Sequence, residues 1–151
     1  MNLKSPFTVD IGKLLNQSVD RIDLNLKGNI SGIESRNCAV LPDRDILVLV
    51  VIERIRRGVI CQGTVRSFWD GECSRCLEHA SVGMQIDFKE LFVTDPDIET
   101  EYELIGDKIN FIPLVSELLI VELPLIPLCK VTCKGLCQVC GVNLNMGSCS
   151  C

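Results

Sequence analysis

The sequence predicts an α+β fold in which most of the chain forms a small antiparallel sheet, barrel-like or sandwich-like, with one or two helices and a C-terminal cysteine-rich tail. Three observations predict it. Several segments alternate apolar and polar residues, one segment has helical spacing, and six of the ten cysteines lie in the last 23 residues. We therefore divide the chain into a mostly β domain, residues 1–128, and a metal-binding tail, residues 129–151, packed on that domain.

The N-terminal elements are short. Residues 5–16 open with Phe7, Val9 and Ile11 alternating with polar neighbours, which indicates a strand, and Leu14 with Leu15 indicates a helical turn. Residues 19–26 alternate less regularly and predict a second strand. The glycines of residues 28–32 predict a turn or loop.

The central elements form the sheet. Residues 46–57 begin with an unbroken apolar run, which predicts a strand buried on both faces, and a turn near residues 56–58 leads into an alternating strand over 59–68. A turn at 69–71 follows. Another strand is predicted over 81–93, with one apolar face made by Val82, Met84, Ile86 and Phe88.

An acidic loop over 94–101 leads to the last predicted elements. Residues 102–105 and 108–111 are expected to pair across a turn at 106–107. A helix is predicted over 112–122, because Pro113 suits a first helical turn and Leu114, Leu118 and Val121 have helical spacing. Prolines at 124 and 127 end it.

Composition limits the classes of function. The chain has 151 residues, is 47% hydrophobic and carries a net charge of −5, which argues against a charge-driven nucleic-acid binder. Residues 87–107 alone sum to −7, whereas the tail has lysines and no acid. No apolar run approaches the roughly 20 residues that span a membrane, and residues 1–20 contain no signal-peptide core, so we expect a cytoplasmic protein without a membrane partner.

The tail cysteines indicate zinc. A reducing cytoplasm disfavours stable disulfides, and zinc prefers four tetrahedral ligands. Cys137 and Cys140 form a C-x2-C pair followed by Gly141, which gives the backbone the freedom to curl around an ion. Cys149 and Cys151 follow after a loop short enough to complete the site. Lys130 and Lys134 would offset the negative charge of a four-thiolate centre.

Cys73 and Cys76 form a second C-x2-C pair. They combine with Cys129 and Cys133 in a second four-sulfur site, or instead complete one long-range site with Cys137 and Cys140; the spacing leaves both arrangements open. A redox pair and an iron–sulfur cluster are alternative readings. The remaining cysteines, at 38 and 61, are interpreted as buried neutral residues. His79 is a fifth candidate ligand, or a solvent-facing turn residue.

A second candidate surface is basic. Its proposed RNA-contacting residues are Arg54, Arg56, Arg57, Arg66, Arg75 and Trp69. Arginine forks bind phosphate and aromatic rings stack on bases. The alternative is a charged strand edge that discourages aggregation. With a single histidine and no phosphate-binding loop, the sequence predicts no catalytic site, so we expect a protein that is not an enzyme.

The motifs together resemble a known family. The stretches that carry the resemblance are Glu72-Cys-Ser-Arg-Cys-Leu77, Glu122-Leu-Pro-Leu-Ile-Pro-Leu-Cys129, Cys133-Lys-Gly-Leu-Cys-Gln-Val-Cys-Gly-Val-Asn-Leu-Asn145, Cys149-Ser-Cys151 and the opening Phe7-Thr-Val-Asp-Ile11. They are similar to the YceD family, the large ribosomal RNA subunit accumulation proteins. Gln138 departs from the proline of many relatives, and some relatives keep the middle cysteine pair without the tail. The resemblance implies a bacterial or plastid protein that supports large-subunit ribosomal RNA, binds metal and has no established catalysis.

Three functions follow as hypotheses. The first is a non-catalytic ribosome-biogenesis factor that binds large-subunit ribosomal RNA and holds structural zinc. The second is an adaptor that docks a basic ribosomal protein or a nuclease without touching RNA, which the acidic net charge favours. The third is a thiol redox or metal-delivery protein. The sequence predicts no oligomeric state.

Overall fold

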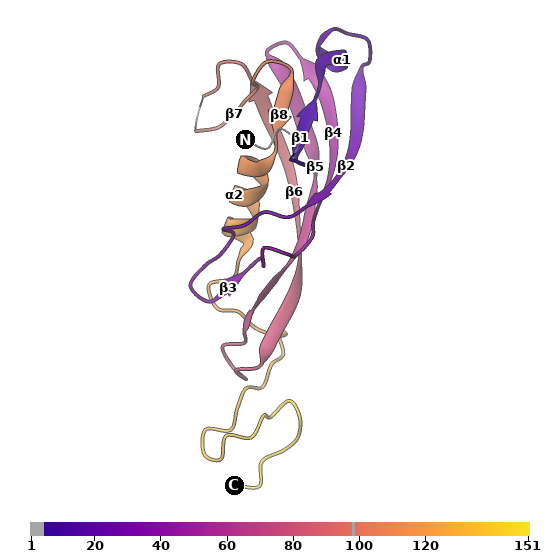
Figure 1. The fold of residues 1–151 in the computed structure, drawn as a ribbon. Coiled ribbons are helices and arrows are strands. Elements are labelled where there is room, and N and C mark those ends of the chain that lie inside the picture. Colours follow the sequence, from indigo (N-terminus) through magenta and orange to yellow (C-terminus); the bar gives the residue numbers. More distant parts are fainter. Residues whose placement is uncertain (1–4, 98) are drawn as a thin grey trace.

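The fold is built on one long, twisted sheet (Figure 1), seen in a computed structural model that describes residues 5–97 and 99–151. Its strands are β2 (Arg21–Gly28), β4 (Ile46–Ile55), β5 (Gly58–Glu72), β6 (His79–Val93) and β7 (Tyr102–Glu103), hydrogen-bonded in that order. β3 (Cys38–Ala39) pairs separately with β5. All of these pairings are antiparallel except β6 with β7.

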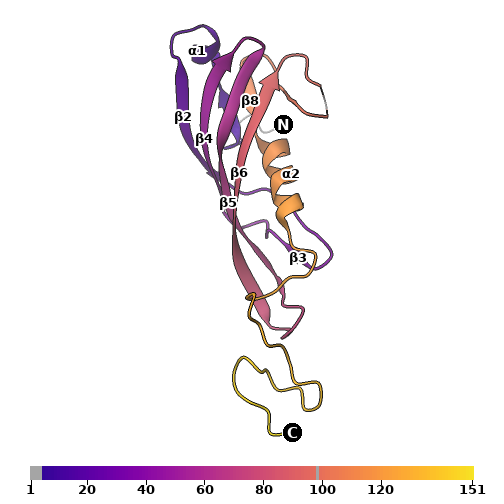
Figure 2. The same ribbon diagram turned by 180° about the vertical axis from the view of Figure 1, so that it is seen from behind.

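The β5–β6 hairpin is longer than its neighbours. The two strands pair from Gly58 opposite Val93 to Glu72 opposite His79, whereas β4 pairs with β5 only as far as Arg66. The hairpin therefore runs past the end of β4, toward the C-terminal tail (Figures 1 and 2). The mostly antiparallel α+β class is confirmed; the sheet is open, with β2 and β7 as its edges in the described part of the chain.

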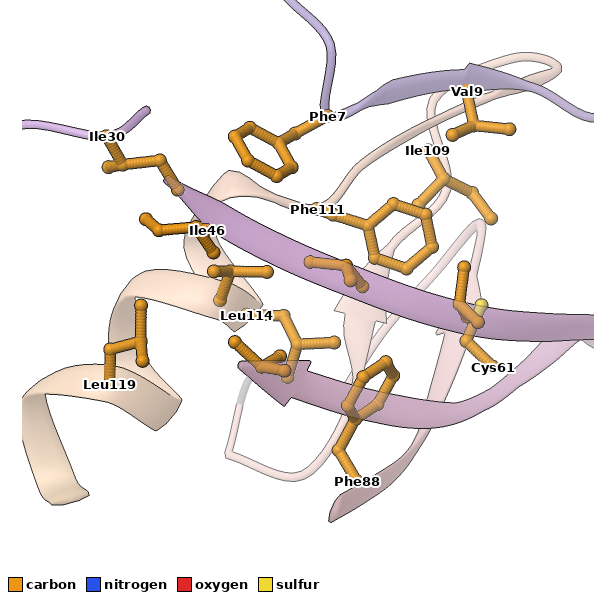
Figure 3. Close-up of a cluster of buried hydrophobic side chains, with 14 of the residues drawn as sticks. Phe7, Val9, Ile30, Ile46, Cys61, Phe88, Ile109, Phe111, Leu114 and Leu119 are labelled. Carbon is orange, nitrogen blue, oxygen red and sulfur yellow. The ribbon is translucent and has the colours of Figure 1, made fainter. Parts of the chain in front are cut away.

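A second layer covers one face of this sheet. It consists of a two-stranded sheet, β1 (Thr8–Asp10) with β8 (Lys108–Asn110), and of the helices α1 (Gly12–Leu15) and α2 (Ile112–Glu122) (Figure 2). Phe7, Phe111 and Leu114 from this layer lie in one cluster of buried side chains with Ile46 of the sheet, and all four are fully buried (Figure 3). Burial of such side chains contributes about 1.5–3 kcal/mol each.

The strand predicted to be buried on both faces is buried on one. Ile46, Val48 and Ile52 of β4 face the second layer, whereas Leu47 and Leu49 are 40% and 37% exposed. The prediction is wrong because none of residues 5–97 and 99–151 forms a layer over the opposite side of the sheet, which we name the outer face. The turn predicted at 69–71 is also wrong, since β5 continues through those residues.

The predicted pairing of residues 102–105 with 108–111 is replaced by two others. β7 pairs with β6, and β8 pairs with β1. What remains of the predicted hairpin is a single bridge between Ile105 and Lys108, around a turn in which Gly106 has φ 62°. The two segments separate because each completes a different layer.

The predicted helix over 112–122 is confirmed with its bounds, but its buried side differs. Leu114, Val115 and Leu119 are buried, whereas Val121 is 84% exposed. Residues two positions apart in a helix point in directions that differ by about 200° around the helix axis. A helix that buries Leu119 therefore turns Val121 to solvent. Neither described helix is long and apolar enough to cross a membrane.

Candidate metal centres

Eight cysteines gather in two groups of four. The inner cluster comprises Cys73, Cys76, Cys129 and Cys133, and the outer cluster comprises Cys137, Cys140, Cys149 and Cys151. Within each cluster the four sulfur atoms lie within 4.8 Å of one another. Both predicted groups of four are therefore found in the structure. The alternative site, in which Cys73 and Cys76 would join Cys137 and Cys140, is not formed, because these two pairs lie in different clusters.

The inner cluster is buried and spaced for a single ion. Cys73, Cys76 and Cys133 are 0%, 3% and 4% exposed. Its sulfur atoms are 3.7 Å apart between Cys73 and Cys133, and 3.8 Å apart between Cys76 and Cys129. Tetrahedral ligands at zinc–sulfur distances of about 2.3 Å are about 3.8 Å from one another. The observed spacing therefore matches four thiolates on one zinc-sized ion.

Two distant parts of the chain build the inner cluster. Cys73 and Cys76 lie in the loop that closes the β5–β6 hairpin, and Cys129 and Cys133 lie in the segment after α2. The Ser74 N–H donates to the carbonyl of Pro127 at 2.8 Å, which joins these parts through the backbone. The Arg75 guanidinium donates to the Cys133 carbonyl at 3.0 Å.

The outer cluster is more open. Cys140 and Cys151 are exposed, and Cys137 and Cys149 are half-buried. Cys149 lies 3.3 Å from the Cys137 sulfur and 3.5 Å from the Cys140 sulfur. These distances are a few tenths of an ångström shorter than tetrahedral zinc requires, so the exposed loop would expand slightly around an ion.

The two C-x2-C loops share one backbone geometry. In the first, Cys73 N–H donates to the Glu78 carbonyl and Leu77 N–H to the Cys73 carbonyl, both at 2.9 Å. In the second, Cys137 N–H donates to Val142 at 2.8 Å and Gly141 N–H to Cys137 at 2.9 Å. The residue after each second cysteine is left-handed, with φ 62° at Leu77 and 77° at Gly141. Both loops therefore need a left-handed residue at this position. Glycine adopts that conformation without strain in the second loop, whereas a leucine adopts it in the first.

Hydrogen bonds prepare some inner-cluster thiols to ionise. Burial acts to raise the pKa of Cys73, but backbone N–H groups, foremost that of Cys76, outweigh it and lower the pKa to about 6. The Asn145 amide, 3.2 Å from the Cys133 sulfur, is the main cause that lowers the pKa of Cys133. Burial raises the pKa of Cys129 to about 12. Four adjacent thiolates need a cation to share their charge.

The outer cluster also contains thiols with a lowered pKa and thiols with a raised pKa. Backbone N–H groups, first that of Cys140 and then that of Val139, lower the pKa of Cys137 to about 6. The neighbouring Cys149 sulfur is the main cause that raises the pKa of Cys151 to about 11. In each cluster two thiols have a lowered pKa and are ready to act as first metal ligands: Cys73 and Cys133 in the inner cluster, and Cys137 and Cys140 in the outer one.

The other predicted residues near the clusters are not ligands. Cys38 and Cys61 are buried away from both clusters, as expected, and burial raises the pKa of Cys61 to about 12, so its thiol is neutral. His79 lies outside both clusters. It begins β6 instead of lying in a turn, is exposed, and places Nε2 3.3 Å from Oδ1 of Asp70. All ten cysteines are free thiols.

The arginines predicted to contact RNA do not form one cluster. Arg54, Arg56 and Arg57 lie at and beside the β4–β5 turn, where Arg57 is paired with Glu101 at 2.9 Å. Arg66 lies opposite Leu47, at the far end of β4. Seven register positions separate Arg66 from Arg54, which is roughly 20 Å along the sheet.

The remaining two residues of that set are also apart. Arg75 lies at the tip of the hairpin, occupied with backbone carbonyls of the tail. Trp69 is 5% exposed in the core, so the prediction that its ring contacts RNA is wrong. Side chains alternate along β5, and the exposed aromatic ring is therefore that of its neighbour Phe68.

One polar network was not predicted. Arg44 donates to both carboxylate oxygens of Asp70, at 2.7 and 2.8 Å, and to the Ser81 hydroxyl at 2.8 Å. Asp70 is buried, and although burial acts to raise its pKa, the Arg44 and Ser81 hydrogen bonds lower it overall. No periodicity in the sequence signals this contact, because Arg44 lies in the loop before β4 and meets Asp70 only through the pairing of β4 with β5.

Comparisons with known proteins agree on one family. A family model described as the large ribosomal RNA subunit accumulation protein YceD matches residues 61–151. An uncharacterized protein of Mycobacterium tuberculosis is 32% identical over 162 residues, which cover 95% of this chain and 73% of that protein. A maize chloroplast protein, named as a YCED homolog for large ribosomal RNA subunit accumulation, is 28% identical over 145 residues, 73% of this chain and 50% of its own. No solved structure matches the chain.

Proposed function

The chain belongs to the YceD family of large ribosomal RNA subunit accumulation proteins, and from this premise we propose that it is a non-catalytic factor that binds large-subunit ribosomal RNA or its precursor. The plant relatives are named for large ribosomal RNA subunit accumulation. The observation that carries the proposal is the family match over the β5–β6 hairpin, α2 and the tail. We place the protein in the cytoplasm, where its ten free thiols would stay reduced.

Both cysteine clusters are proposed to hold structural zinc. The sulfur spacing of the inner cluster fits four ligands on one ion, and the tail has few apolar side chains to hold its shape. A four-iron cluster instead spreads its cysteines over four ions and needs wider spacing. Elemental analysis of the purified protein should find two zinc ions per chain. A labile metal, or thiols that readily form a disulfide, would favour the redox or metal-delivery hypothesis instead.

Ultraviolet crosslinking in cells, followed by sequencing of the RNA bound to the protein, tests the main proposal. We expect large-subunit ribosomal RNA or its precursor to be enriched above an untagged control. Depletion of the protein should lower the large-subunit to small-subunit ratio. Recovery of background RNA only, together with a normal ribosome profile, would refute it.

An acidic hollow supports the adaptor as a second candidate. Five glutamates line it, beside the stacked rings of Phe92 and Tyr102: Glu90, Glu99, Glu101, Glu103 and Glu117. Glu90 is partly buried and its pKa is raised, first by burial and then by Glu117. Such a hollow suits a lysine- or arginine-rich protein segment. Association with a ribosomal protein that survives ribonuclease treatment would favour this function.

A further inference from the structure

The outer face carries a groove away from both cysteine clusters. It lies beside the start of β4, near Leu47. It has a volume of about 650 Å³, within the range of small-ligand sites. Its walls include Lys27, Arg44, Leu47, Arg66, Phe68 and Gln85, and we name it the Phe68 groove. The residues come from β2, β4, β5, β6 and from the loop before β4, so most of them lie on the sheet.

An aromatic platform forms the floor of the Phe68 groove. Phe68 is 47% exposed, and its ring lies against Gly83, the residue opposite it on β6, which has no side chain to displace the ring. The Arg44 guanidinium lies 5.2 Å from the centre of the ring. Its bonds to Asp70 and Ser81 hold it in place. The guanidinium lies over the ring, so that these two flat groups are in place before any ligand arrives.

Three cations, Lys27, Arg44 and Arg66, line the groove together with two acids, Asp43 and Asp45. Arg66 lies on the same face of β5 as Phe68 and forms no ion pair within residues 5–97 and 99–151. Lys27 is paired with Asp45 at 3.2 Å, but both side chains are more than half exposed. Exposed pairs contribute at most about 1 kcal/mol, so Lys27 can exchange its partner for a phosphate.

We propose that the Phe68 groove binds an unpaired nucleotide of single-stranded RNA, an inference that rests on the proposed function. The base would stack on the Phe68 ring and the Arg44 guanidinium, while Arg66 and Lys27 bind the flanking phosphates. The Gln85 amide, opposite Arg66 on β6, can hydrogen-bond a base edge. An acidic peptide would form ion pairs with Lys27 and Arg66 but would not stack on the Phe68 ring.

The surroundings favour a strand of RNA over a free nucleotide. The outer face continues along the sheet to a second hollow, whose lining includes Arg21, Gln62, Thr64 and Lys89 beside the acids Glu53 and Asp87. A chain can therefore enter and leave the Phe68 groove along the sheet, with further donors on its path. Open sheets that present an aromatic ring bind single-stranded RNA in this manner.

Fluorescence anisotropy with a labelled oligouridylate and the zinc-loaded full chain tests the site. Phe68→Ala should weaken binding about tenfold, the effect of losing one stacked base. Arg66→Gln should weaken it at low salt and reduce the slope of log affinity against log salt by about one. Leu49→Ala, on the same face, and Lys108→Gln, in β8 of the second layer, are the control variants and should stay within about twofold. Emission from Trp69, the sole tryptophan and a core residue, reports whether each variant is folded.

Wild-type affinity in folded Phe68→Ala and Arg66→Gln variants would overturn the inference, as would equal losses in the two controls. Displacement of the oligonucleotide by uridine monophosphate at equal nucleotide concentration would also overturn it, because the site would then serve a free nucleotide. Ribosomal RNA recovered from crosslinked cells would leave the proposed function standing in each case. Absence of that RNA with wild-type protein would count against the function itself.

Discussion

Replacing Cys76 with serine separates the role of the inner cluster from that of the outer cluster. Cys76 is almost fully buried, and its sulfur lies 3.8 Å from that of Cys129, 53 residues further along the chain. The change removes one thiolate and with it the tight hold on the proposed inner zinc. We expect the zinc content to fall from two ions to one.

The energetic cost follows from chain entropy. A link between positions 53 residues apart restricts the unfolded chain by about 4 kcal/mol, whereas a link between Cys140 and Cys149, 9 apart, restricts it by about 2.5 kcal/mol. In a domain of this size each kcal/mol shifts the melting temperature by about 2–4 °C. Cys76→Ser should therefore lower the melting temperature by roughly 10 °C.

Calorimetry, zinc analysis and limited proteolysis measure the outcome. Cys151→Ser should lose one zinc ion and make the tail sensitive to protease, yet leave the melting temperature of the sheet nearly unchanged, because the outer cluster closes only its own loop. Cys38→Ser is the control: the thiol is buried outside the clusters, with Ser35 Oγ 3.4 Å away as a partner for a hydroxyl. Equal melting losses for Cys76→Ser and Cys151→Ser, or two zinc ions retained by Cys76→Ser, would refute the reasoning.

Three further predictions follow from the same contacts. Cys140 and Cys151 are exposed, so a chelator should remove the outer zinc first, and mass spectrometry after alkylation should find the label in the outer cluster before the inner one. Asp70→Asn should destabilise the protein by roughly 2 kcal/mol at neutral pH, because it breaks a buried pair with Arg44. Since the pKa of Asp70 is lowered in the folded state, its stabilisation is present above the unfolded pKa and is lost as pH falls through the folded one; urea titrations of the two proteins should converge in acid. Leu77→Gly should keep zinc and stabilise the folded state by about 0.5 kcal/mol, since it relieves a left-handed conformation, whereas Leu77→Val should destabilise it in the same urea titration.

Elements set by local pattern were predicted from the sequence. The α2 bounds were correct because Pro113 and the prolines after Glu122 limit the helix from both sides. The C-x2-C loops were recognisable because both depend on residues that are adjacent in the chain. The same holds for the β4–β5 turn, where Ile55 pairs with Gly58.

Features set by long-range contacts were not predicted from the sequence. An apolar run such as Ile46–Ile52 cannot indicate whether a second layer covers both faces of a strand or only one. The pairing of β8 with β1 joins segments about 100 residues apart, and nothing near Lys108 announces it. The Arg44–Asp70 pair and the Phe68 groove likewise depend on the registers of β5 with β4 and with β6.

The β5–β6 hairpin connects the proposed zinc to the proposed RNA site. Beyond the end of β4 it is a ribbon of two strands, and such ribbons are marginally stable alone. The structure supports it there in three ways: β3 pairs along one edge, Arg44 joins the loop before β4 to Asp70, and the inner cluster closes the tip. Phe68 lies on the supported ribbon, on the strand that ends at Glu72, immediately before Cys73. The family match begins within β5 and continues through the tail, so it contains the ribbon and all four ligands of the inner cluster. A metal that touches no RNA would still serve RNA binding, because it fixes the strand that carries the stacking ring.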